Sequence, residues 1–114
     1  ALTRAFAYVE AGADGIMIHS RKKTADEIIE FCDKFRARYS DIPIVVVPTS
    51  YNYITEAELA AHGVNIVIYA NQLTRSAFPA MENTAKEILK NHRALEVDSK
   101  LMPFKDIITL IDEL

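Results

Sequence analysis

Cysteine, tryptophan and basic clusters are scarce in this 114-residue chain, which has one cysteine, no tryptophan and a formal net charge of −3. A single cysteine, Cys32, cannot form an internal disulfide, which favours a reducing compartment and a cytoplasmic location. The one basic triplet, residues 21–23, is typical of a solvated loop, with a phosphate contact as the alternative. No long face gathers lysine and arginine, so no nucleic-acid partner is predicted. No apolar run approaches the length of about 18 residues that a membrane span needs, so no membrane partner is expected.

The remaining composition is that of one globular domain. Half of the residues are hydrophobic and a quarter are charged, which excludes a disordered chain. The length suits one ordinary domain and not two. Cys32 falls on the apolar side of a helical pattern, which indicates a buried hydrophobic residue and not a nucleophile.

Three apolar runs each stop at a small polar cluster, and each is followed by a helical pattern; they span residues 15–20, 44–50 and 66–72. This layout is typical of parallel strands in an α/β protein, whose carboxyl ends form the face that binds ligand. The side chains at those ends are therefore the candidate substrate-binding residues, namely His19, Ser20, Thr49 and Asn71.

Glycines and capping residues set the expected helix boundaries. Gly12 and Gly63 follow helical patterns and predict helix ends. Residues 24–27 (Thr-Ala-Asp-Glu) and 55–58 (Thr-Glu-Ala-Glu) each have the spacing of a capping box, so a helix is expected to begin at both places. A longer helix is predicted around residues 77–92, with Pro79 either in its first turn or at a kink.

Three strands are too few for a closed fold of this kind. A (β/α)8 barrel needs eight strands, and a three-stranded parallel sheet leaves two apolar edges. We therefore expect the carboxyl-terminal part of a (β/α)8 TIM barrel, with about three βα units in residues 1–95 and a C-terminal extension in residues 96–114. The extension carries one apolar stripe on a predicted helix, made of Phe104, Ile107, Ile108 and Ile111.

Residues 10–22, Val46-Val-Pro-Thr49 and residues 63–71 together resemble the phosphoenolpyruvate mutase family of the isocitrate lyase superfamily. The resemblance implies an isomerase that interconverts phosphoenolpyruvate and phosphonopyruvate, forming a carbon–phosphorus bond for phosphonate biosynthesis. It also implies a small anionic substrate, Mg²⁺ with ligands upstream of this chain, and a homo-oligomer that exchanges a barrel helix.

The resemblance gives the candidate residues their roles. His19 matches the family's substrate-contacting histidine, with Ser20 beside it, and Thr49 and Asn71 match the ends of the next two strands. Other roles stay open, because His19 can be satisfied by neighbouring side chains and Thr49 and Asn71 can cap strand ends. No catalytic residue and no metal ligand is assigned within this chain.

Three other functions remain alternatives. Phosphonopyruvate hydrolases and lyases of 2-hydroxy acids belong to the same superfamily, and the segments that separate them cannot be matched here. A non-catalytic α/β assembly module, formed by pairing of partial barrels, is the alternative from another class. In each enzymatic case we expect this chain to have no turnover by itself.

Overall fold

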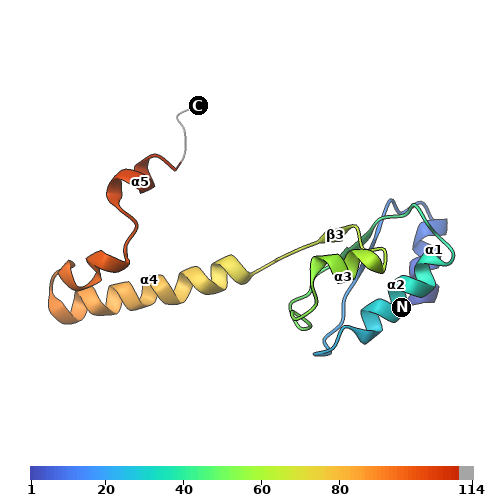
Figure 1. The fold of residues 1–114 in the computed structure, drawn as a ribbon, viewed down its shortest axis with the longest axis horizontal. Helices are drawn as coiled ribbons and strands as arrows, with labels where there is room; N and C mark the ends of the chain where they lie inside the picture. Colours follow the sequence, from blue (N-terminus) through green and yellow to red (C-terminus); the bar gives the residue numbers. More distant parts are fainter. Residues whose placement is uncertain (111–114) are drawn as a thin grey trace. The chain divides into compact units, whose positions relative to one another are not determined.

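The computed structural model describes residues 1–110, and Ile111 of the predicted stripe lies outside them. The chain divides into two compact units, residues 1–70 and residues 71–114 (Figure 1). The predicted division into a partial barrel over 1–95 and an extension over 96–114 stays a prediction. No helix within residues 1–110 combines the length and the apolar character that crossing a membrane requires.

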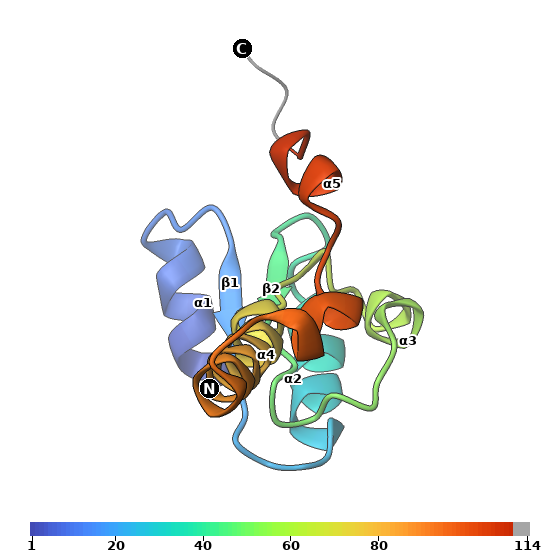
Figure 2. The same ribbon diagram turned by 90° about the vertical axis from the view of Figure 1, so that its left-hand side faces the viewer.

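The first unit alternates helices and strands. Its elements are α1 (Leu2–Glu10), β1 (Ile16–Ile18), α2 (Asp26–Arg36), β2 (Ile44–Val46), α3 (Glu56–Ala61) and β3 (Ile66–Val67). The three strands form one parallel sheet in the order β1-β2-β3, with Ile18 opposite Val46 and Val46 opposite Val67. Figure 2 shows β1 and β2 side by side, with α1 next to β1. The predicted parallel α/β arrangement is confirmed.

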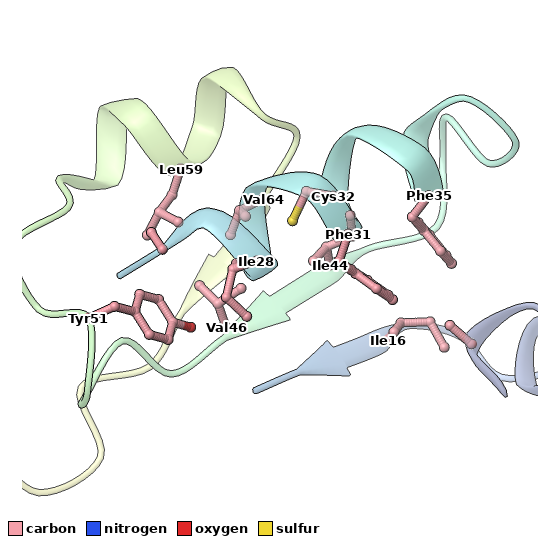
Figure 3. Close-up of a cluster of buried hydrophobic side chains, with 12 residues drawn as sticks. Ile16, Ile28, Phe31, Cys32, Phe35, Ile44, Val46, Tyr51, Leu59 and Val64 are labelled. Carbon is pink, nitrogen blue, oxygen red and sulfur yellow. The ribbon is translucent and has the colours of Figure 1, made fainter. Parts of the chain in front are cut away.

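The hydrophobic core lies between the sheet and helix α2 (Figure 3). Strand residues Ile16, Ile44 and Val46 are buried there, and the helix contributes its apolar side, Ile28, Phe31, Cys32 and Phe35. Cys32 is fully buried, as its place in the helical pattern predicts.

The opposite face of the sheet is uncovered within the first unit. Met17, Val45 and Ile66 lie in one row of paired residues, and their positions alternate with those of the buried strand residues. Met17 is 60% exposed and Ile66 is 49% exposed. Strands of a parallel sheet normally have both faces covered, so this apolar face is one to which a closed barrel would add partners.

One of the two predicted capping boxes is confirmed. The Thr55 hydroxyl accepts a hydrogen bond from the Glu58 amide at 3.2 Å, and the Glu58 carboxylate accepts one from the Thr55 amide at 2.8 Å. The predicted helix-ending glycines are also confirmed, since Gly12 and Gly63 have φ of +99° and +83°.

The predicted capping box at Thr24 is wrong. Helix α2 is capped at Ala25, without a side-chain capping bond. Glu27 does not reach back to the helix start, because its carboxylate binds Ser20 and Lys22 instead. The backbone amide of Ala25 donates to the hydroxyl of Tyr53 at 3.0 Å. The loop between β2 and α3 therefore supplies the acceptor.

The second unit contains α4 (Gln72–Asn91), a 3₁₀ turn η1 (Leu95–Lys100) and α5 (Phe104–Ile108). Helix α4 begins before the predicted residue 77, and Pro79 is therefore its eighth residue. Of the two predicted alternatives for Pro79, a place in the first turn is excluded, and a kink stays a prediction. The missing N–H of Pro79 leaves the carbonyl of Arg75 without a helical partner. The described members of the predicted stripe, Phe104, Ile107 and Ile108, all lie on α5 and are exposed.

Candidate functional site

The carboxyl ends of the three strands meet at one edge of the sheet, because the strands are parallel and adjacent. His19 directly follows β1, and Thr49 lies in the loop that follows β2. The structure thus places these two predicted residues at the same edge of the first unit. This is the edge at which α/β folds bind ligands.

His19 and Ser20 lie on opposite sides of the chain as it leaves β1. Burial alternates here: Met17 and His19 are exposed, whereas Ser20 is only 6% exposed. Within residues 1–110, no side-chain hydrogen bond engages the His19 ring. The ring is therefore available to a ligand, whereas the Ser20 hydroxyl is directed into the protein.

The Ser20 hydroxyl belongs to a small polar network with Glu27 and Lys22. It donates to Glu27 Oε2 at 2.8 Å and accepts from the Lys22 amide at 3.1 Å. The Lys22 ammonium lies 2.6 Å from Glu27 Oε1. The hydrogen bond from Lys22, followed by that from Ser20, lowers the pKa of Glu27, so the network contains a carboxylate at neutral pH.

Two buried side chains hold the loop that carries Thr49. Pro48 and Tyr51 are buried on either side of Thr49 and Ser50, which are partly exposed. The Thr49 amide donates to the Val47 carbonyl at 2.8 Å, which tightens the turn. The Tyr51 hydroxyl is buried without a well-formed hydrogen bond, and burial raises the pKa of this phenol, which the nearby backbone of Val47 partly offsets. Thr49 is thus presented on a turn fixed by packing.

Tyr53 connects the loops that follow β1 and β2. Its hydroxyl lies at the start of α2, where it accepts the hydrogen bond from the Ala25 amide. Sequence reasoning missed Tyr53, because no local pattern indicates a contact across 28 residues. Glu27 was visible in the sequence, but its spacing from Thr24 indicated a local cap.

Asn71 lies at the start of the second unit, as the N-cap residue of α4. The backbone amide of Asn71 donates to Gln72 Oε1 at 3.1 Å. The side-chain Oδ1 of Asn71 is buried without a hydrogen-bond partner. The side chain makes no capping hydrogen bond to the helix. That Asn71 shares one pocket with His19 and Thr49 stays a prediction.

A cavity of about 420 Å³ lies beside the end of β1, between the start of α1 and the first turns of α2. The candidate residues His19 and Ser20 line this cavity. Charged residues of both signs also line it, namely Glu27, Glu30 and Lys34. Its volume is in the range of small-molecule sites. The ammonium of Lys34 is paired there with Glu30, and the Glu27 carboxylate lies in the same lining, so this cavity does not favour an anion.

Metal ligation is not supported by the part of the chain that the structure describes. Residues 1–110 contain no group of three His, Cys, Asp or Glu side chains placed to hold one ion. The ends of the strands carry hydroxyl, imidazole and amide groups, and Mg²⁺ prefers carboxylate oxygens and water. These residues therefore form no Mg²⁺ site of their own, and the implied ligands upstream of this chain stay a prediction.

A family model described as phosphoenolpyruvate phosphomutase matches residues 1–89. The chain is 44% identical over 111 residues to a phosphonopyruvate hydrolase of Variovorax sp. (strain Pal2), with 96% of this chain and 37% of the relative covered. It is 40% identical over 112 residues to a phosphoenolpyruvate phosphomutase of Streptomyces viridochromogenes, with 98% and 35% covered. The chain thus spans about a third of the length of these relatives.

Solved structures agree with these matches. A phosphoenolpyruvate phosphomutase from Streptomyces platensis subsp. rosaceus superposes with a TM-score of 0.87 at 34% identity, covering 94% of this chain and 36% of that one. A phosphonopyruvate hydrolase in complex with oxalate and Mg²⁺ superposes with a TM-score of 0.81 at 42% identity, covering 94% and 37%. The open parallel sheet is consistent with the predicted part of a TIM barrel.

Proposed function

The chain belongs to the phosphoenolpyruvate phosphomutase family, and we propose that it forms the carboxyl-terminal part of an enzyme that isomerises phosphoenolpyruvate to phosphonopyruvate. The observation that carries this proposal is the exposed His19 at the carboxyl end of β1, the edge at which α/β folds bind ligands. In the proposed full-length protein, the remaining two thirds would complete the barrel around this edge.

The proposed chemistry depends mainly on positioning and electrostatics. Phosphoryl transfer gains little from covalent help by the protein, and most of the catalysis comes from alignment and charge stabilisation. His19 would donate a hydrogen bond to a carboxylate or phosphoryl oxygen of the substrate. Thr49 and Asn71 would orient the substrate or other polar groups.

The hydroxyl of Ser20 is already engaged within the protein. Its single hydroxyl proton is donated to Glu27, so in this geometry it cannot also donate to an anionic substrate. A direct substrate contact by Ser20 stays a prediction that requires the hydroxyl to rotate away from Glu27.

Mg²⁺ would neutralise charge on the phosphoryl group when bound. Since the described residues do not form a site for it, we propose that its ligands belong to other segments of the full-length protein. We further propose that the full-length protein is a homo-oligomer and that it lies in the cytoplasm. A mass measurement of the full-length protein in solution tests the oligomeric state. A folded oligomer that turns over no substrate would instead support the non-catalytic assembly module.

Hydrolysis of phosphonopyruvate is the second candidate function. It is favoured by the 44% identity to the Variovorax hydrolase, compared with 40% to the Streptomyces viridochromogenes mutase. The difference is small, and both relatives extend well beyond the matched region. The two reactions share a substrate, so one assay separates them.

The test follows phosphorus by ³¹P NMR after phosphonopyruvate is added to the full-length protein with Mg²⁺. A mutase produces phosphoenolpyruvate, and a hydrolase produces inorganic phosphate together with pyruvate. We expect His19→Asn to lower kcat/KM on the order of a hundredfold, because it removes a group that orients the substrate.

His92→Asn is the matched control, since His92 has a φ of +53°, a conformation that asparagine tolerates. Absence of both products with the wild-type protein would contradict the proposed function. Turnover that His19→Asn leaves unchanged would contradict the role of His19. The 114-residue chain alone is expected to give neither product.

A further inference from the structure

We propose that Glu27 is a positioning residue that holds the loop after β1, so that His19 faces the substrate. The inference rests on the proposed function only for the identity of the substrate. Glu27 lies on the first turn of α2, and one of its carboxylate oxygens accepts from Ser20 while the other pairs with Lys22. It therefore joins two residues of the turn that begins at His19.

The contacts of Ser20 explain how an indirect role would work. Its hydroxyl is buried against Glu27 at 2.8 Å, and the Lys22 amide donates back to that hydroxyl at 3.1 Å. Neighbouring residues of an extended segment point to opposite sides. Fixing Ser20 on the α2 side therefore fixes His19 on the uncovered side.

Because its carboxylate binds Ser20 and Lys22, Glu27 does not cap its own helix. In a capping box, its carboxylate would bind the backbone at the start of its own helix. Here that helix start is bound instead by the Tyr53 hydroxyl, at 3.0 Å from the Ala25 amide. The loop over residues 19–25 is thus held at one end by Glu27 and at the other by Tyr53.

The experiment compares Glu27→Met with Glu10→Met in the full-length protein. Methionine has nearly the helix propensity of glutamate but accepts no comparable hydrogen bond. Glu10 is a matched control because it is a half-exposed helical carboxylate, paired with Arg38 at 2.6 Å outside the site. Amide hydrogen exchange of residues 19–25 is measured without substrate, and kcat and KM are measured with phosphonopyruvate.

We expect Glu27→Met to speed exchange of residues 19–25 and to lower kcat/KM, each by about tenfold or more, because small displacements of a positioned group cost rate. Exchange in α1 should not change. If Glu27 acts through Ser20, Ser20→Ala should produce a similar loss, and the double variant should lose little more.

Exchange and turnover equal to those of Glu10→Met would overturn the proposal, as would fully additive losses in the double variant. If Glu27→Met fails to fold, Ser20→Ala decides the question by the same two measurements. Wild-type protein without turnover would contradict the proposed function, and the exchange comparison would still decide whether Glu27 holds the loop.

Discussion

The guanidinium of Arg36 donates two hydrogen bonds to the carbonyl oxygen of Gly63, from Nε at 3.0 Å and from Nη2 at 2.6 Å. Its third nitrogen, Nη1, donates to the carbonyl oxygens of Tyr39, Ser40 and Ile42. One side chain at the end of α2 thus fixes the segments that enter β2 and β3. These contacts lie at the amino ends of the strands, the edge associated with stability in barrels.

Replacing Arg36 by lysine should lower the free energy of unfolding by about 2 kcal/mol or more, because an ammonium cannot reproduce the planar set of donors. Chemical denaturation of the full-length protein measures the change. Arg93→Lys is the control, since Arg93 makes an exposed ion pair with Glu96 and should change stability by less than about 1 kcal/mol. Equal losses in both variants would show that the carbonyl contacts of Arg36 contribute little.

Replacing Thr55 by alanine should destabilise the protein by about 1 kcal/mol, because it removes the side-chain cap of α3. Thr24→Ala should change the stability by less than about 0.5 kcal/mol, since α2 has no side-chain capping bond there. The same denaturation measurement compares the two variants. If Thr24→Ala lowered the free energy of unfolding as much as Thr55→Ala, the capping box that the sequence indicates at Thr24 would be supported after all.

Replacing Tyr51 by phenylalanine should raise the free energy of unfolding by about 1 kcal/mol. The change removes a buried hydroxyl that makes no well-formed hydrogen bond and keeps the packed ring. Tyr53→Phe should have the opposite sign, with a loss of about 1 kcal/mol, because Ala25 loses its acceptor. Thermal unfolding of the two variants shows whether each is more or less stable than the wild type. Destabilisation by Tyr51→Phe would indicate that the Tyr51 hydroxyl has a hydrogen-bond partner.

Cys32 should resist thiol reagents in the native protein, because burial raises the pKa of its thiol to about 11. An unfolded cysteine ionises near pH 9, so above that pH the unfolded chain releases a proton that the native protein retains. Stability should therefore fall as the pH rises from 9 to 11, by up to about 2 kcal/mol from this residue. Cys32→Ala should show a shallower decline in pH-dependent denaturation, and an identical decline would exclude the thiol as the cause.

The elements with strong local signals could be predicted from the sequence. Gly12 and Gly63 end helices where their conformational freedom predicts, and the Thr55 box forms because both of its partners are local. The parallel sheet followed from apolar runs that end in polar residues. His19 and Thr49 were placed at one edge by that topology alone.

Contacts between distant segments could not be predicted in this way. Glu27 has equally good local and non-local partners, and only the folded loop shows that Ser20 and Lys22 bind it. The hydroxyl of Tyr53 and the guanidinium of Arg36 act across 28 and 27 residues, beyond any periodic pattern. The apolar pattern indicates a helix only from residue 77, whereas α4 begins at Gln72.

The uncovered row of Met17, Val45 and Ile66 makes this chain suited to fragment complementation. Within residues 1–110, the outer strands β1 and β3 of the sheet each have one unpaired side, which can accept further strands from a separately produced polypeptide. If the proposed full-length enzyme is a closed barrel, co-expression with the remaining two thirds of a relative should give turnover from two chains.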